Sequence, residues 1–148
     1  MDEGDLIPEL ECWELLASAS VGRIALSLHA LPAIFPVQYY LDGRSLAVCL
    51  GHHELPGRAL NAVVAFAADA IDPTSRSGWS VQIQGQASVP AHPTAGAFCG
   101  QPAAGQIVQI EPGTISGHRV HLCPLIDSLL SGTATPGPAA KRDVWPGH

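Results

Sequence analysis

The sequence predicts one mainly β domain with flanking helices, and three observations lead to this prediction. Residues 79–87 alternate between apolar and polar side chains, the pattern of a strand with one buried face. Asp42-Gly43 separates two apolar runs, as expected of a tight hairpin. The chain has 148 residues, 47% of them hydrophobic, which is enough for one substantial core. We therefore expect residues 1–130 to form a single domain.

The first half of the chain is predicted to contain one helix and three strands. Residues 7–19 place apolar side chains at spacings of three and four between glutamates, which predicts an amphipathic helix. Segments 21–28 and 32–40 are rich in residues with high β propensity and are expected to be strands. The hairpin turn then leads into a strand at 45–50, because its glycine tolerates the positive φ that such turns need.

The second half continues the β pattern. A short helix at 58–62 is expected to precede a buried strand at 63–67, which is a continuous apolar run. The loop 73–78 separates that strand from the alternating one. Two closing strands are predicted, at 106–110 and 118–122, and both are expected to pair within the same β structure.

The charge balance and the two termini limit the function classes. Seven Lys and Arg residues stand against thirteen Asp and Glu, giving a net charge of -6, so no nucleic-acid partner is expected. The acidic start, Met1 to Asp5, lacks the basic and apolar regions of a secretory signal, and no apolar run approaches ~18 residues. We expect a cytoplasmic protein with no membrane partner. Residues 131–148 are poor in apolar side chains and are predicted to form a disordered tail.

The cysteines and histidines are not expected to form a metal or nucleophilic site. His52-His53-Glu54 is better explained as a polar loop, because adjacent residues seldom converge on one ion. On a strand, His118 and His121 point to opposite faces, so only His121 and Cys123 could cooperate. The cysteines are widely spaced without a C-x-x-C pair, which favours buried thiols, and for Cys49 a core role is preferred over a nucleophile beside His52 or His53. The four cysteines are Cys12, Cys49, Cys99 and Cys123.

Several phrases occur in an order and spacing that resembles the pyridoxamine 5'-phosphate oxidase superfamily, in particular its actinobacterial members. They are Glu11-Cys12-Trp13, Val21-Gly22-Arg23-Ile24-Ala25, Pro32-Ala33-Ile34-Phe35-Pro36-Val37, Gly78-Trp79-Ser80-Val81 with Gly85, Val64-Ala65-Phe66 and Ile115-Ser116-Gly117-His118-Arg119. Together they cover roughly residues 6 to 122.

The resemblance implies a six-stranded split β-barrel that pairs into a homodimer, with FMN or a deazaflavin in each of two clefts at the subunit interface. Such a cleft suits a flat apolar ring. Strand 36–39 and segment 79–81 would then line the ring, and stretch 48–58 would face the ribityl phosphate. The cofactor-binding residues implied in this way are Val37, Gln38, Tyr39, Cys49, Arg58, Trp79 and Ser80.

At the phosphate end, the chain departs from these relatives. They carry an Arg and a Ser or Thr at the end of the third strand and a Lys at the next helix, which give phosphate charge-assisted hydrogen bonds. Counting back from the following strand without a gap puts Val48, Cys49 and Glu54 at these places. Segment 103–109 also lacks the Trp and basic residues of relatives. Arg58 could reach a phosphate if the loop shifts register, and His52 or His53 could help when protonated.

Two further residues have alternative roles. Arg23 lies in an apolar strand and is expected either to form a structural ion pair, with Asp69, Asp72 or Glu11, or to contact a ligand. For Trp79, a core position is favoured over a position beside the pocket.

Three functions follow as hypotheses. The first is a flavin- or deazaflavin-dependent oxidoreductase, in which the cofactor supplies the hydride chemistry. The second is a cofactor-free descendant whose cleft binds, cyclises or isomerises an apolar small molecule, and the missing phosphate ligands favour it. The third is a ligand-binding module without catalysis. Arg58 pointing into the cleft would favour flavin, whereas Glu54 pointing inward would oppose it.

Overall fold

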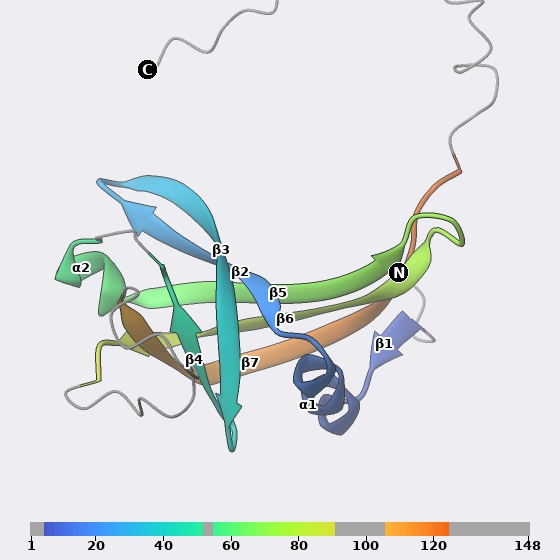
Figure 1. The fold of residues 1–148 in the computed structure, drawn as a ribbon, viewed down its shortest axis with the longest axis horizontal. Helices are drawn as coiled ribbons and strands as arrows, with labels where there is room; N and C mark the ends of the chain where they lie inside the picture. The colour runs from blue at the N-terminus through green and yellow to red at the C-terminus, as the bar shows by residue number, and fades with distance from the viewer. Residues whose placement is uncertain (1–4, 52–54, 91–105, 125–148) are drawn as a thin grey trace, which may run out of the picture.

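The computed structural model describes residues 5–51, 55–90 and 106–124, and these form a mainly β fold (Figure 1). The predicted mainly β class is therefore confirmed. The elements are β1 (Leu6–Ile7), α1 (Glu9–Ser18), β2 (Val21–Leu28), β3 (Leu31–Asp42), β4 (Ser45–Cys49), α2 (Gly57–Leu60), β5 (Val63–Asp72), β6 (Ser77–Ser88) and β7 (Ile107–His121). The predictions for residues 52–54, Cys99, 103–105 and 131–148 lie outside the described residues.

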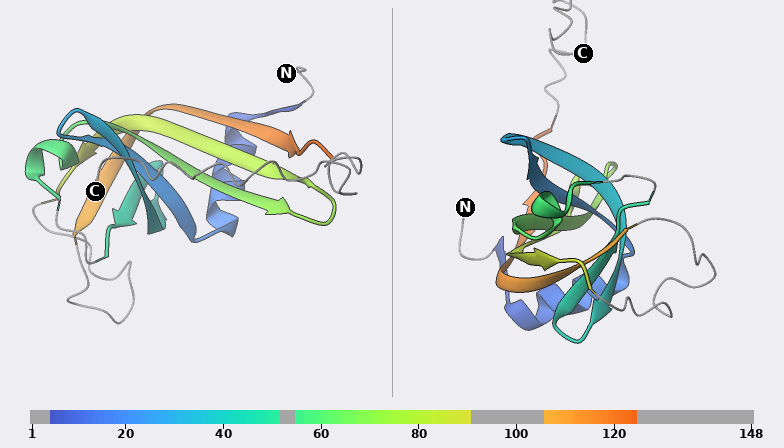
Figure 2. Two further views of the ribbon diagram at one scale, coloured as in Figure 1. Left: turned by 90° about the horizontal axis from the view of Figure 1, so that it is seen from above. Right: turned by 90° about the vertical axis from the view of Figure 1, so that its left-hand side faces the viewer.

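The strands form one antiparallel sheet that closes on itself. Its order is β1-β7-β4-β3-β2-β5-β6, and a further pairing of β7 with β6 completes a ring of six strands. The two-residue strand β1 pairs with the far part of β7 outside this ring. Figure 2 shows the strands curving around a common centre, with α2 at one end of the barrel and α1 packed along its side. Among the described helices, none is long and apolar enough to cross a membrane.

The core fills the inside of the barrel, as the alternating pattern predicted. On β6, Val81 and Ile83 are fully buried, while Gln82 and Gln84 point outward. The other strands repeat this arrangement, because successive side chains of a strand point to opposite faces. The largest fully buried side chains are Phe66, Leu16, Ile24, Leu46, Leu50, Leu60, Ile83 and Ile110.

Two tight hairpins set the strand register in the first half. Asp42 pairs with Ser45, so the predicted hairpin is confirmed with Gly43 at a φ of 61° as the first turn residue. The hairpin between β2 and β3 lacks glycine, yet His29 and Ala30 adopt φ values of 50° and 65°. Left-handed turn residues of this kind match the twist of the strands on either side.

The prediction of two separate closing strands is wrong. One continuous strand, β7, runs from Ile107 to His121 and pairs with β6 along its length. The sequence pattern breaks at Pro112-Gly113, where the register shifts between Gln84 and Gly85. A β-bulge accepts a proline, because the ladder is already interrupted there. The broken pattern therefore marks a bulge within one strand and not a gap between two.

Candidate functional site

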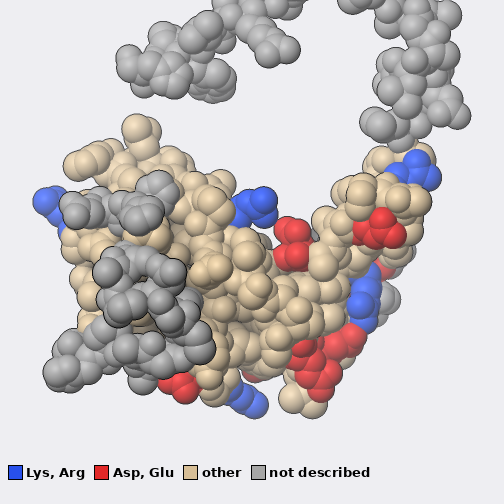
Figure 3. All heavy atoms as spheres, in the orientation of Figure 1, with Lys and Arg blue, Asp and Glu red and all other residues tan. Residues whose placement is uncertain are grey.

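The outer surface of β2, β3 and β5 is unusually apolar for an exposed sheet. We call it the apolar face; its aliphatic side chains are Val21, Ala25, Ile34, Pro36, Val63 and Ala65, and the charged Arg23 and Asp69 lie on the same outer side. Ala25 lies opposite both Ile34 and Ala65, so the patch is continuous across three strands. Val21, Ile34 and Val63 are 57%, 66% and 72% exposed. Figure 3 shows one side of the molecule, where charged side chains are sparse and lie mainly toward the margins. Contiguous exposed apolar surface is a common feature of interaction sites.

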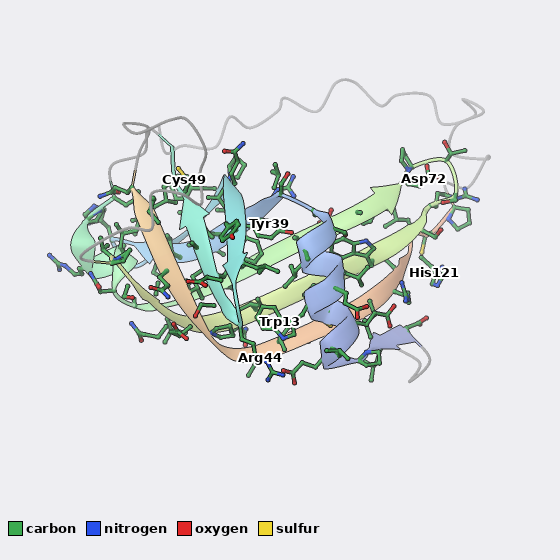
Figure 4. All side chains as sticks on the ribbon, turned by 60° about the horizontal axis from the view of Figure 1, so that its bottom comes forward. Trp13, Tyr39, Arg44, Cys49, Asp72 and His121 are labelled. Carbon is green, nitrogen blue, oxygen red and sulfur yellow. The ribbon has the colours of Figure 1, made fainter. Side chains whose placement is uncertain are left out.

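Two of the predicted site residues meet at the edge of this surface. Gln38 is exposed on the outside of β3, between Val21 on one neighbouring strand and Cys49 on the other. Cys49 is half-buried at the end of β4, opposite Ile107. Figure 4 shows Cys49 at this end of the strand, facing away from the helix α1. An amide and a thiol therefore stand side by side next to apolar surface.

Val37 and Tyr39 point the other way, into the core. They are 3% and 6% exposed. The Tyr39 hydroxyl donates a hydrogen bond of 2.5 Å to the backbone carbonyl of Leu16, and its ring packs edge-on against Phe66 with 4.9 Å between centroids. Burial raises the pKa of Tyr39 to about 12. The structure therefore places both side chains in the core, away from the outer surface, and the Tyr39 hydroxyl links β3 to α1.

The burial of Tyr39 has a consequence at high pH. Its ordinary pKa of 10.0 applies in the unfolded chain and its pKa of about 12 in the folded one, so between these values only the unfolded tyrosine releases its proton. The free energy of unfolding is therefore expected to fall as the pH rises from 10.0 to about 12. Below pH 10.0, the free energy of unfolding of Tyr39→Phe should be lower by about 1 kcal/mol, because the hydrogen bond to Leu16 is lost. Above this pH, the stability of the variant should fall less steeply than that of the wild type, because it has no tyrosine hydroxyl at position 39 to ionise. Denaturation curves of both proteins across this range measure the effect, and equal pH slopes would contradict it.

The end of the barrel that should receive a phosphate contains little positive charge. Val48 is fully buried, so its side chain belongs to the core and not to a ligand site. Arg58 is exposed on α2, next to the buried Ala59 and Leu60, which hold the helix against the barrel end. Among the described residues, the guanidinium of Arg58 forms no ion pair, and the residue is exposed to solvent on α2. Among the described residues of stretch 48–58, Arg58 is thus the one with a cationic side chain.

Sequence reasoning missed the role of Gln106. Its Oε1 accepts a hydrogen bond of 3.0 Å from the backbone amide of Leu55, and its Nε2 donates one of 3.5 Å to the carbonyl of the same residue. The backbone carbonyl of Gln106 also accepts a hydrogen bond of 2.9 Å from the Leu50 amide. This residue therefore fastens the segments on both sides of 52–54 to the start of β7. A glutamine at the margin of a weakly patterned segment offers no sequence signal for such a contact.

Trp79 and Ser80 lie on β6, which β5 and β2 separate from β3, the strand that contains Gln38. Trp79 packs against the core, in agreement with the favoured core position, whereas Ser80 lies on the outside of β6 between Asp69 and His118. Ser80 pairs near the end of β7, while Cys49 pairs near its start. Figure 4 shows the same separation between Cys49 and His121, the last residue of β7. One protomer therefore does not bring the predicted ring-lining residues together.

Arg23 does not form the predicted ion pair within the part of the chain that the structure describes. It is exposed on β2, opposite Pro36 and Ala67. Glu11 instead forms an ion pair with Arg119. Asp72 accepts a hydrogen bond of 2.8 Å from the backbone amide of Thr74.

The histidine and cysteine candidates for a metal site are also dispersed. The imidazole of His121 lies 3.8 Å from a carboxylate oxygen of Asp5, and Cys123 is exposed beyond the end of β7. Among residues 5–51, 55–90 and 106–124, no three side chains of the metal-binding types form a group that could hold an ion. Cys12, in contrast, is buried, and burial raises the pKa of its thiol.

Comparison with known proteins gives concordant results. Residues 8–97 match the family described as pyridoxamine 5'-phosphate oxidase. The chain is 34% identical over 127 residues to the uncharacterized protein Rv0080 of Mycobacterium tuberculosis, and this match covers 74% of the chain and 81% of that protein. The FAD-binding protein from Mycobacterium smegmatis superimposes with a TM-score of 0.63 at 26% identity, over 78% of this chain and 97% of that one. A conserved protein of unknown function from Corynebacterium diphtheriae has a TM-score of 0.62 and 26% identity, over 79% and 97% of the two chains.

Proposed function

Because the chain belongs to the pyridoxamine 5'-phosphate oxidase family, we propose that it is a flavin-binding protein that acts as a homodimer. The separation of the predicted ring-lining residues on the barrel supports this proposal. Gln38 and Cys49 lie opposite each other on β3 and β4, whereas Ser80 lies on β6, three strands from β3 in the sheet order, so the three side chains are not neighbours in one protomer. A second copy can bring its own Ser80 to the Gln38 and Cys49 of the first.

The apolar face supplies the surface for this pairing. Three neighbouring strands expose aliphatic side chains, and burying them against a second copy would remove them from water. Two-fold pairing makes two equivalent clefts, one for each protomer. A flat flavin ring suits such a cleft because its two faces are largely apolar. The mass in solution, by sedimentation or light scattering, is expected to be twice the 15.4 kDa of the chain.

The residues present fit the ring better than they fit the phosphate. Gln38 offers an amide that can donate to and accept from the polar edge of a flavin ring, beside the aliphatic surface. At the phosphate end, Val48 is buried in the core and Cys49 stands where relatives carry a hydroxyl residue, so Arg58 is the cation that remains among the described residues of this stretch. The FAD-binding protein from Mycobacterium smegmatis shares this fold, and on this ground we include FAD among the candidates.

A bound flavin would supply the hydride chemistry of an oxidoreductase. The chain's own part is then to hold the ring, orient it and keep water away. Gln38 would fix the orientation through its amide, and the apolar face would exclude water from one side of the ring. This division of labour requires no ionisable acid or base among the described outer-face residues next to Gln38.

The first experiment is a visible absorption spectrum of the purified protein, followed by titration with riboflavin, FMN and FAD and then dialysis. We expect a retained band near ~450 nm with at least one of the three. A protein that stays colourless after dialysis against all three would contradict flavin binding. The differences between the three affinities measure how much the phosphate and the adenosine contribute to the binding free energy.

Arg58→Gln tests the phosphate end. If the guanidinium binds the phosphate, its loss is expected to weaken FMN about 10-fold or more while leaving riboflavin unchanged, since a hydrogen bond to a charged group contributes about 1.5–3 kcal/mol. Isothermal titration with both ligands measures this difference. Arg44→Gln is the matched control, because Arg44 lies in the hairpin turn at the opposite end of β4 and is paired with Glu9. Equal weakening of both ligands by Arg58→Gln would contradict a phosphate contact.

The buried Val48 favours one alternative. This valine lies in the core at a position where relatives carry a phosphate ligand, as expected of a descendant that has lost its cofactor. The cleft of such a descendant would bind, cyclise or isomerise an apolar small molecule. Failure of all three flavins to bind a homodimer would support this alternative.

A further inference from the structure

The apolar face contains two charged side chains of opposite sign. Arg23 is the charged residue of β2, and it lies between Pro36 on β3 and Ala67 on β5. Asp69 lies two residues beyond Ala67 on the same side of β5. Both side chains are exposed. They are therefore placed within a surface that is otherwise aliphatic.

Neither charge has an ion-pair partner among the described residues of its own chain. The ion pairs of that part of the chain join Arg44 to Glu9, Arg119 to Glu11 and His121 to Asp5. Arg23 and Asp69 are diagonal neighbours on adjacent strands, a relation that separates their backbones by about 7–8 Å. In the single chain, both side chains are exposed and therefore accessible to water.

Covering the apolar face would remove that water. An arginine that becomes buried without a carboxylate is strongly destabilising, so any protein docked on this surface must offer a partner for each charge. A second copy of the chain does so automatically: in a two-fold interface, if one residue contacts another, the reverse contact occurs as well. The arginine of one copy can meet the aspartate of the other, twice.

We infer that Arg23 of each protomer forms an ion pair with Asp69 of its partner across the apolar face. This inference rests on the proposed homodimer and adds the contact that determines how the two copies are oriented. Complementary charges within an apolar interface select one orientation, because other arrangements leave like charges opposed or unpaired.

Charge reversal provides the test. Arg23→Asp and Asp69→Arg each turn both intersubunit pairs into like-charged pairs, and each is expected to raise the dimer dissociation constant about 100-fold, as close charge pairs at interfaces show. Sedimentation across a dilution series of the full-length protein measures this constant. Thr114→Asp and Thr114→Arg are the controls, because Thr114 is exposed on the outside of β7 opposite Gln84, on a strand that is not part of the apolar face, and these variants should leave the dimer unchanged.

Mixing the two reversed proteins decides whether the pair spans two chains. In a heterodimer of Arg23→Asp with Asp69→Arg, both contacts again join opposite charges, so native mass spectrometry should find the heterodimer in large excess over either homodimer. The double variant Arg23→Asp/Asp69→Arg should also dimerise like wild type. If the double variant dimerises like wild type but the mixed single variants do not form the heterodimer, the ion pair of residues 23 and 69 lies within one chain and the inference is wrong.

The remaining outcomes separate this inference from the proposed function. A wild-type protein that sediments as a monomer contradicts the homodimer itself. A wild-type dimer whose constant is unchanged in both single variants contradicts the ion pair alone, and leaves flavin binding to be judged by its own titration. Circular dichroism of each variant establishes that the barrel is folded in every comparison.

Discussion

Phe66→Ala is expected to lower the free energy of unfolding by about 3–5 kcal/mol. Phe66 is 1% exposed and is the largest of the fully buried side chains in the described chain. Its ring packs edge-on against Tyr39 and lies directly beneath Gly22, where an added Cβ would be 2.5 Å from the ring. The side chain therefore fills the space between two strands, and its removal leaves a cavity that the closed barrel cannot collapse to fill.

Chemical denaturation at one fixed protein concentration measures this loss, since the stability of a dimer depends on concentration. Phe66→Leu retains most of the volume and is expected to cost about 1.5 kcal/mol or less. Tyr40→Ala removes an aromatic side chain of similar size from the outside of β3, where Tyr40 is about half exposed, and should cost far less than Phe66→Ala. Similar losses for Phe66→Ala and Tyr40→Ala would show that burial inside the barrel is not the source of the effect.

Gly85→Ala is expected to destabilise the protein by about 3 kcal/mol or more. Gly85 lies at the bulge where β6 and β7 close the barrel, and a Cβ at this position would be 2.0 Å from the backbone carbonyl oxygen of Glu111. Because the obstacle is backbone, no side chain can move aside. The two strands would have to separate at the seam of the barrel.

Gly113→Ala is the matched control across the same bulge. A Cβ on Gly113 would be 3.4 Å from the carbonyl oxygen of Gln84, a tight but tolerable contact, so we expect a change of less than about 1 kcal/mol. Thermal or chemical denaturation of both variants gives the comparison. If Gly85→Ala is as mild as Gly113→Ala, the close approach at Gly85 does not limit the closure of the barrel.

The sequence predicted the local structure well where periodicity carried the information. The alternation over 79–87 gave the buried and exposed faces of β6, and the apolar spacing before Ser18 gave α1. The prediction was wrong at Pro112-Gly113, because in the sequence a bulge within one strand resembles a loop between two strands. A bulge depends on the partner strand opposite, and a single segment contains no trace of that partner.

The candidate site could be predicted only in part from the sequence. The sequence could nominate Gln38, Cys49 and Ser80, but their positions on the barrel depend on pairing between strands far apart in the chain. The direction of each side chain followed from strand parity, which placed Tyr39 inside and Gln38 outside. The side-chain contacts of Gln106 with Leu55 had no sequence signal, because they join residues 51 positions apart.

By itself, the amino-acid sequence determined the mainly β class and the inward faces of the strands, since these follow from residue type and local periodicity. Only the tertiary structure decided that Val48 lies in the core, that Ser80 is far from Cys49, and that Arg23 and Asp69 share one apolar surface. The physical reason is that closing a barrel brings together residues whose separation along the chain is unrelated to their separation in space.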